Sequence, residues 1–346
     1  MAAYTGTKPA VKELIELLRV QEGLAGGHFT GITTLHEGKL YTAKVCGDLD
    51  DLLKKTSVLD FPGTTGIAHS RTPGYPDDTW AQPFSAPFAG TVFCANGVGA
   101  GKVLPFPEDT FLKAEKLLAS TPCKLTTGVE KDLTPYPALS DGKFYHSTEI
   151  ESALIGEFHR QGADMRQALQ KAFTFMPTQI AALALAEDEP GTITVLRYNQ
   201  ALFFGKKEKD GGFCIATSCT AFQDLGYKYF QAVPAGTIGK LTQKEFSFEA
   251  IESHLDKLVL NPPCGEAAKF FEGLLSNGKE WGLLDLFDEL VKVPELSPPD
   301  KSPQDSFLLY TFLAEKCRKG ELVTSYRMVP GSRPGSLRKE TTFRKV

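Results

Sequence analysis

Apolar residues recur at helical spacing near the start of the chain. Over residues 9–21 they fall on one side of a 3.6-residue helix, and charged residues occupy the rest. The residues on this side are Val11, Leu14, Ile15, Leu17 and Leu18. The next segment, HFTGITTLHEGKLYTAKVCG, is rich in β-branched and aromatic residues, with HEG at its centre. The pattern predicts a helix followed by a β-hairpin.

Helices and strands then come in groups. Short helices are predicted over 48–60 and 107–120. Two more, separated by Gly162, are predicted over 146–176, and Ser147 or Thr148 caps the first of them. Strands are predicted at TGIAHSR, GTVFCANG, QIAALALA, GTITVLRYN, ALFFGKK and GFCIATS, with a closing pair in YFQAVPAGTIGKLT. This order favours an α+β fold with helices covering antiparallel sheets, rather than a doubly wound parallel sheet.

After about residue 248 the pattern becomes one of amphipathic helices joined by proline-rich segments. These helices are predicted at EAIESHLDKLVL, GEAAKFFEGLLSNGK, WGLLDLFDELVKV and SFLLYTFLAEKCRKG. The end of the chain, VTSYRMVPGSRPGSLRKETTFRKV, predicts two polar strands around a Pro/Gly turn. Its basic stretch, 327–345, is typical of a solvated hairpin.

Composition narrows the classes of function. A net charge of −4 over 346 residues argues against a general nucleic-acid-binding protein. We find no apolar run of about 18 residues and no signal-peptide pattern, and therefore expect a cytoplasmic protein with no membrane partner. The seven cysteines and six histidines are scattered without CxxC or HExxH spacing. We therefore expect reduced thiols, no metal site and no cofactor.

Four stretches carry candidate chemistry: GIAHSR (66–71), the proline-rich loop after it, CANG (94–97) and HSTEIE (146–151). Taken alone, each has an ordinary structural interpretation, as a strand end, a turn or a capped helix. Their order and spacing, however, resemble the class II glutamine amidotransferase domain, an N-terminal-nucleophile (Ntn) glutaminase. That family shows G-I-A-H-T-R-W-A-T-H-G, then H-N-G, then D-T-E at a helix start.

The resemblance implies a four-layer αββα Ntn-hydrolase sandwich over residues 1–245, followed by a helical extension with a C-terminal β-hairpin over 246–346. It also implies an amidohydrolase that cleaves the side-chain amide of glutamine or a γ-glutamyl compound through a thioester. In the family, an N-terminal cysteine attacks the amide and its own α-amine shuttles the proton.

The same resemblance suggests roles for residues of this chain. Asn96 and Gly97 match the oxyanion hole, and Arg71 matches the arginine that binds the substrate carboxylate through two parallel hydrogen bonds. The loop from Thr72 to Trp80 matches the segment that closes over the substrate, with Gly74 and Tyr75 as lining residues.

The chain departs from the family at its start, MAAYTG. With Gly6 aligned on the family glycine, Ala2 occupies the position of the nucleophilic cysteine. Either the cysteine was replaced to trap a substrate, or this is a natural homologue without catalytic activity. The retained Arg71 and Asn96–Gly97 favour a replaced cysteine in an active-site mutant.

Other departures affect the ligand. Ser147 replaces the aspartate that binds the α-ammonium of glutamine, which removes a charge-assisted contact worth roughly 1.5–3 kcal/mol. Glu149 or Glu151 could compensate, or could be ordinary first-turn acids. His28 stands at another family aspartate and is expected to be a hydrogen-bonded structural residue. Thr72 replaces a tryptophan that helps to gate ammonia tunnels in the family.

Three functions remain open at this level. The extension is too short for a sugar-isomerase or phosphoribosyltransferase domain, and we find no phosphate loop. We therefore expect a stand-alone amidohydrolase for a small-molecule amide that carries a carboxylate. The alternatives are a glutaminase subunit that delivers ammonia to a separate synthase, and a non-catalytic ligand-binding homologue. A homo-oligomer and a complex with a synthase both stay open.

Overall fold

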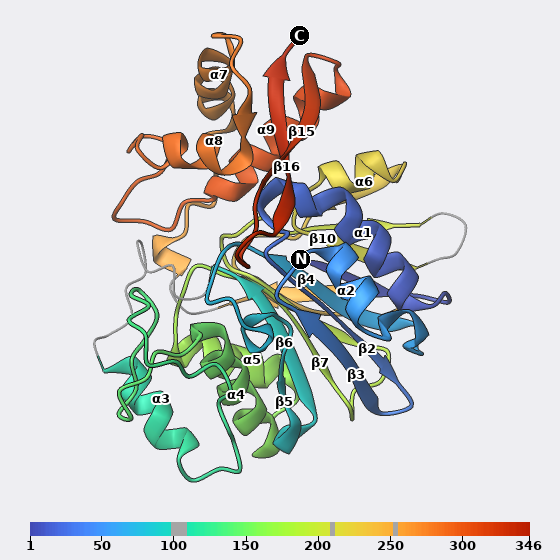
Figure 1. Ribbon diagram of the computed structural model, residues 1–346, viewed down its shortest axis with the longest axis vertical. Helices are drawn as coiled ribbons and strands as arrows, with labels where there is room; N and C mark the ends of the chain where they lie inside the picture. Colours follow the sequence, from blue (N-terminus) through green and yellow to red (C-terminus); the bar gives the residue numbers. More distant parts are fainter. Residues whose placement is uncertain (98–108, 208–211, 252–254) are drawn as a thin grey trace.

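Two antiparallel sheets form the centre of the molecule. The computed structural model describes residues 1–97, 109–207, 212–251 and 255–346 (Figure 1). The first sheet has seven strands in the order β11-β9-β10-β1-β4-β2-β3. Their bounds are β1 Ala2–Thr5, β2 Phe29–His36, β3 Lys39–Val45, β4 Thr65–Arg71, β9 Phe203–Lys206, β10 Phe213–Ala216 and β11 Tyr229–Ala232.

The second sheet has six strands in the order β13-β12-β8-β7-β6-β5. Their bounds are β5 Phe84–Ala86, β6 Thr91–Asn96, β7 Ala181–Ala186, β8 Ile193–Arg197, β12 Thr237–Leu241 and β13 Phe246–Ala250. The helices that accompany the two sheets are α1 Ala10–Ala25, α2 Leu49–Lys55, α3 Thr110–Leu118, α4 Ser147–Arg160, α5 Met165–Phe175 and α6 Thr220–Asp224.

Three apolar clusters separate the layers. One cluster lies between the sheets and includes Ala3, Ile67 and Leu183. A second packs α1 on the outer face of the seven-stranded sheet, and a third packs α4 and α5 on the outer face of the six-stranded sheet. The predicted four-layer α+β sandwich is confirmed. Successive side chains of a strand lie on opposite faces of its sheet, and both faces are buried in an apolar cluster. For this reason strand segments such as QIAALALA are apolar throughout.

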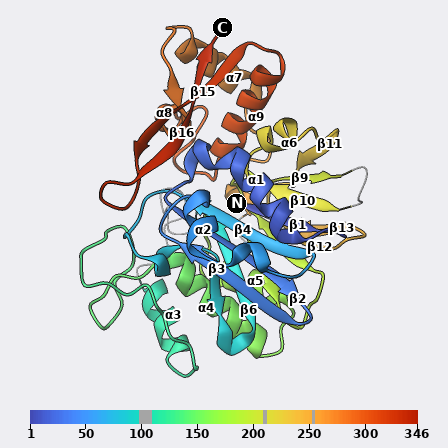
Figure 2. The same ribbon diagram turned by 45° about the vertical axis from the view of Figure 1, so that its right-hand side comes forward.

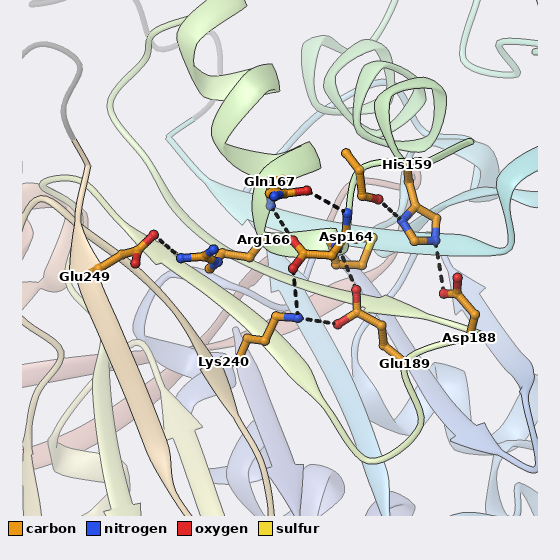
Figure 3. Close-up of polar contacts among 10 residues, drawn as sticks. His159, Asp164, Arg166, Gln167, Asp188, Glu189, Lys240 and Glu249 are labelled. Atoms are coloured by element: carbon orange, nitrogen blue, oxygen red, sulfur yellow. Dashed lines mark hydrogen bonds and ion pairs between the residues drawn. The ribbon is translucent and has the colours of Figure 1, made fainter. Parts of the chain in front are cut away.

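Polar contacts hold α5 at the rim of the six-stranded sheet (Figure 3). Asp164 caps the helix by accepting from the Gln167 backbone N–H at 2.8 Å, and the Gln167 side chain accepts in return from the Asp164 N–H at 3.2 Å. The ammonium of Lys240 on β12 lies 3.3 Å from Asp164 and 2.9 Å from Glu189. The capping box therefore also ties the helix to the sheet.

Most predicted elements are present, with three corrections. The cap of α4 is His146, whose Nδ1 accepts from the Thr148 N–H at 3.2 Å, rather than Ser147 or Thr148. The predicted closing pair is split, because β11 pairs with β9 and β12 pairs with β8, in different sheets. In place of the helix expected at EAIESHLDKLVL, the described residues of this segment form the end of β13 and a short 3₁₀ turn at Leu255–Lys257, and residues 252–254 lie outside the described part of the chain.

The C-terminal extension sits at one end of the sandwich. It contains α7 Cys264–Leu275, β14 Trp281–Gly282, α8 Leu283–Leu290, α9 Asp305–Arg318, β15 Leu322–Pro330 and β16 Leu337–Lys345. The predicted terminal hairpin is confirmed, and it forms a three-stranded sheet with β14. β13, which follows the boundary expected at residue 245, belongs to the six-stranded sheet of the sandwich.

The extension is anchored to the sandwich by packing and by buried hydrogen bonds. The hairpin lies beside α1 in both ribbon views (Figure 2), and α8 also contacts α1. The guanidinium of Arg197, at the end of β8, donates to Gln304 Oε1 at 2.6 Å, and the Asn199 amide donates to the Pro303 carbonyl at 3.0 Å. Of the helices described, none has the length and apolar character needed to cross a bilayer.

Candidate active site

A cavity of about 410 Å³ opens where β1 begins and where β4 and β6 end, beside the extension. Both sheets, α1, α4, α8 and α9 contribute to its lining. Four residues predicted from the sequence line it together: Arg71, Asn96, Gly97 and Ser147. These residues come from three separate stretches of the chain, and the fold brings them to one place.

Asn96 is held by hydrogen bonds on both sides of its amide. Its Oδ1 lies 2.9 Å from His69 Nε2, and its Nδ2 donates to Thr217 Oγ1 at 3.1 Å. Because an amide oxygen only accepts, this assignment makes His69 Nε2 the donor. Burial, as the main cause, lowers the pKa of His69 well below its usual value, so the imidazole is neutral. The amide is thus fixed in orientation at the cavity wall.

Gly97 adopts a backbone conformation that requires glycine. Its φ is +96°, and a Cβ atom would lie 2.2 Å from the Gln179 carbonyl oxygen. Among the described residues, no oxygen accepts a hydrogen bond from the Gly97 N–H. The Asn96 side chain and the Gly97 N–H are therefore adjacent donors at the cavity.

Arg71 is a buried cation without a carboxylate partner in the described part of the chain. Its side chain lies at the end of β4, and the residue is 7% exposed. The guanidinium donates to the Trp80 carbonyl at 2.9 Å and to the Tyr136 hydroxyl at 2.7 Å, and its central carbon lies 4.9 Å from the centroid of the Phe29 ring. Burial lowers the pKa of Arg71. A buried charge of this kind favours an anionic ligand.

The loop after Arg71 differs in part from the prediction. Thr72 lines the cavity, but Gly74 and Tyr75 do not. Gly74 packs against the Arg71 guanidinium, where a Cβ would lie 3.0 Å from its nitrogens. The Tyr75 ring instead packs on Trp80, with 5.9 Å between ring centroids. An aromatic residue that does line the cavity is Tyr136, from a turn-rich segment without a recognisable motif.

The start of β1 also differs from the prediction. Side chains alternate along a strand, and Ala2 joins Tyr4 in the cluster packed against α1. Met1 joins Ala3 in the cluster between the sheets, and it is Met1 rather than Ala2 that lines the cavity. The Met1 carbonyl accepts from the Thr217 N–H at 3.1 Å. Burial lowers the pKa of the Met1 α-amine to about 6. The cavity-facing position is therefore residue 1.

Neither Glu149 nor Glu151 of α4 lines the cavity. Glu149 accepts hydrogen bonds of 2.6 to 3.0 Å from the backbone N–H groups and hydroxyls of Thr126 and Thr127. Glu151 is fully buried, and burial raises its pKa to about 8. Of the described residues that line the cavity, none is an aspartate or a glutamate. No carboxylate among them therefore compensates for Ser147.

His28 has the structural role that the sequence indicates. Its Nδ1 lies 2.8 Å from the Ser332 hydroxyl in the turn between β15 and β16. Burial, assisted by Arg338 and Arg71, lowers the pKa of His28 to about 4, so the ring is neutral. His28 connects the sandwich to the terminal hairpin and does not line the cavity.

The extension supplies a wall of the cavity that the sequence did not predict. Its lining residues are Leu283, Leu284, Phe287, Ser306, Leu309 and Tyr310. Their helical periodicity is visible in the sequence, but their contact with residues more than 150 positions away is not. His69 and His146 were also missed as lining residues, although both stand within the recognised motifs.

The sequence of the chain was compared with those of known proteins. No protein-family model matches the chain. It is similar to glutamine–fructose-6-phosphate aminotransferase (isomerizing) from Pyrococcus horikoshii, with 28% identity over 204 residues, 58% of this chain and 30% of the relative. The corresponding enzyme of Rhizobium leguminosarum bv. viciae is 26% identical over 253 residues, 72% of this chain and 36% of the relative.

Solved structures agree on the architecture. Glutamine phosphoribosylpyrophosphate amidotransferase from B. subtilis superposes with a TM-score of 0.56 and 16% identity, over 94% of this chain and 66% of that one. The chain has the class II glutamine amidotransferase fold. The Ntn sandwich inferred from GIAHSR, CANG and HSTEIE is therefore confirmed. The chain spans about a third of the length of the curated relatives it matches.

Proposed function

We propose that this chain binds a small amide that carries a carboxylate, in the manner of a glutaminase. The Arg71 guanidinium would bind the carboxylate, and the amide carbonyl oxygen would point to Asn96 Nδ2 and the Gly97 N–H. The observation that carries the proposal is the buried Arg71 charge, unpaired by any described carboxylate, in one cavity with the Asn96–Gly97 donors. The names of the relatives include glutamine, which is an amide that carries a carboxylate.

The ligand need not carry an ammonium group. Glutamine presents an α-ammonium beside its carboxylate, and among the described lining residues there is no acid to receive it. Transfer of an unpaired charge into a cavity is costly. Glutaramate, the monoamide of glutarate, has the same carboxylate and amide without the ammonium. We therefore expect glutaramate to bind at least as tightly as glutamine.

Thioester chemistry needs a thiol that the described cavity lining lacks. In that reaction the thiol sulfur bonds to the amide carbon, the C–N bond breaks, and the thiol proton passes through the α-amine to the leaving amine. The Met1 thioether has no proton to give, and of the described lining residues none is a cysteine. An α-amine whose pKa is near 6 is unprotonated at neutral pH and can accept that proton. The present chain would therefore bind the amide without forming a thioester.

Calorimetric titration with glutaramate and glutamine tests the binding proposal. Binding of either ligand that is weakened at least tenfold by Arg71→Ala supports it. If the folded chain binds neither ligand, the proposal is overturned. The loss of folded structure in Arg71→Ala is monitored by circular dichroism, and Arg71→Lys serves as a second variant that keeps the charge but not the planar fork.

Two cysteine variants test the position of the nucleophile. Met1→Cys, encoded behind a removable methionine, places a thiol on the cavity side of β1, whereas Ala2→Cys places it on the α1 side. We expect ammonia release from glutaramate or glutamine with Met1→Cys and not with Ala2→Cys. Turnover by Ala2→Cys alone would favour the alignment made from the sequence. Turnover by neither variant, with the amide still bound, would identify a binding module without glutaminase capacity.

A further inference from the structure

The cavity has a polar end and an apolar end. The sandwich supplies polar groups, with Arg71, Asn96 and His146 on its wall. His146 is buried, and its Nε2 has no hydrogen-bond partner among the described residues. The extension and α1 supply apolar side chains instead. These are Leu18, Leu283, Leu284, Phe287, Leu309 and Tyr310.

A series of contacts connects the polar end of the cavity to α9 of the extension. Arg71 and His69 are two residues apart on β4, so their side chains lie on the same face of the sheet. His69 contacts Asn96, which in turn contacts Thr217. Two residues later, the Cys219 thiol lies 3.5 Å from the carbonyl oxygen of Tyr310 on α9. These contacts lead from β4, which carries Arg71, through Asn96 to α9 of the extension.

Some apolar side chains of α8 at the cavity remain exposed to solvent. Leu283, Leu286 and Leu290 of α8 are buried. Of the α8 residues that line the cavity, Leu284 is 37% exposed and Phe287 is only partly buried. An apolar side chain in contact with water contributes free energy to binding when a ligand covers it. The primary amide of glutamine carries only hydrogen atoms on its nitrogen, and it would leave this wall uncovered.

We infer that the ligand is a secondary amide whose nitrogen carries an apolar substituent, and that this substituent packs against Leu284 and Phe287 of α8. The inference rests on the proposed function, because it uses the carboxylate and the carbonyl to orient the ligand. With the carboxylate on Arg71 and the carbonyl at Asn96, the amide nitrogen faces the extension. The extension is then the part of the chain that selects the substituent on the amide nitrogen of the ligand.

Titrations with glutaramate and N-butylglutaramate test the inference. Each buried methylene contributes up to about a fourfold gain in affinity, so we expect N-butylglutaramate to bind at least about tenfold more tightly. In the double variant Leu284→Gln, Phe287→Ser the ratio of the two dissociation constants should fall to about two. Leu260→Gln, at a leucine that is 63% exposed and outside the cavity lining, should preserve the ratio.

Other outcomes overturn the inference in distinguishable ways. Equal affinity for the two glutaramates would refute the apolar subsite while the proposed function stands. A gain for N-butyrylglutamine over N-acetylglutamine, with none for N-butylglutaramate over glutaramate, would put the apolar group beside the carboxylate and refute the orientation. If neither glutaramate binds to the folded chain, the proposed function fails and the inference fails with it.

Discussion

His69 Nε2 lies 2.9 Å from Asn96 Oδ1, and this contact orients the amide that faces the cavity. Asn96 Nδ2 is held in turn by Thr217, so the amide has little freedom to rotate. A donor fixed before the reaction stabilises a developing oxyanion without reorganisation. The pair is therefore expected to act mainly on the chemical step once a thiol is present.

The first prediction concerns this pair in the Met1→Cys chain. Asn96→Ala should lower kcat by about 10²–10³, the usual effect of losing one oxyanion donor. His69→Ala should lower kcat by about tenfold, because Asn96 keeps only its contact with Thr217. Steady-state ammonia release measures both variants. A rise in KM with unchanged kcat would instead assign the pair to ligand binding.

The second prediction compares the loss of the Arg71 guanidinium with the loss of its hydrogen bond to Tyr136. Removing one partner of a buried charge pair typically costs about 2–5 kcal/mol, so Arg71→Ala should weaken glutaramate binding by at least about 30-fold. Tyr136→Phe removes only the 2.7 Å hydrogen bond to the guanidinium and should weaken binding by about three- to tenfold.

Butyramide, which has no carboxylate, is the control ligand for this comparison. Its affinity should be low in the unmodified chain and should change little in Arg71→Ala. Calorimetry with both ligands and both proteins completes a double-mutant cycle. An equal loss for butyramide and glutaramate would show that the substitution damages the cavity rather than a carboxylate contact.

The third prediction concerns backbone geometry at Gly97. Gly97→Ala combines strain at a φ of +96° with a Cβ that would lie 2.2 Å from the Gln179 carbonyl. Gly142 is a matched control, with a φ of +78° and open space where a Cβ would lie. Gly142→Ala should cost about 1–2 kcal/mol of unfolding free energy, and Gly97→Ala clearly more. Urea denaturation compares them, and equal costs would refute the steric argument.

The fourth prediction is a pH dependence caused by Glu151. Its pKa is raised to about 8 by burial, from about 4.3 for a glutamate in an unfolded chain. Between these values the folded chain keeps a proton that the unfolded chain releases. The stabilising contribution is therefore complete below about pH 4 and is lost as the pH rises towards 8, at no more than about 1.4 kcal/mol per pH unit.

Glu151→Gln removes this contribution because glutamine does not titrate. The unfolding free energy of the variant relative to the unmodified chain should rise between pH 5 and pH 8. Urea denaturation at several pH values measures the difference, with the exposed Glu245→Gln as control for the substitution itself. A difference that stays constant across this range would contradict the prediction.

Periodicity and motifs predicted an element or a site residue correctly where its position depends on local contacts or on contacts typical of the fold. The apolar pattern of residues 9–21 predicts α1, because one side of a helix must be buried. Arg71, Asn96 and Gly97 were found together because their motifs mark strand ends in a shared order. The role of Glu149 was not predictable, because its partners Thr126 and Thr127 lie in an irregular segment.

The sequence by itself determined the layered α+β architecture, which depends on local spacing, and its resemblance to the amidotransferase motifs indicated Arg71, Asn96 and Gly97 in the polar half of the cavity. Only the tertiary structure decided which side chain of β1 faces that cavity. Side chains alternate along a strand, so a shift of one residue exchanges Met1 with Ala2, and a motif alignment does not resolve that shift. The apolar wall also depends on tertiary contacts, because α8 packs against α1 and α9 packs against α6.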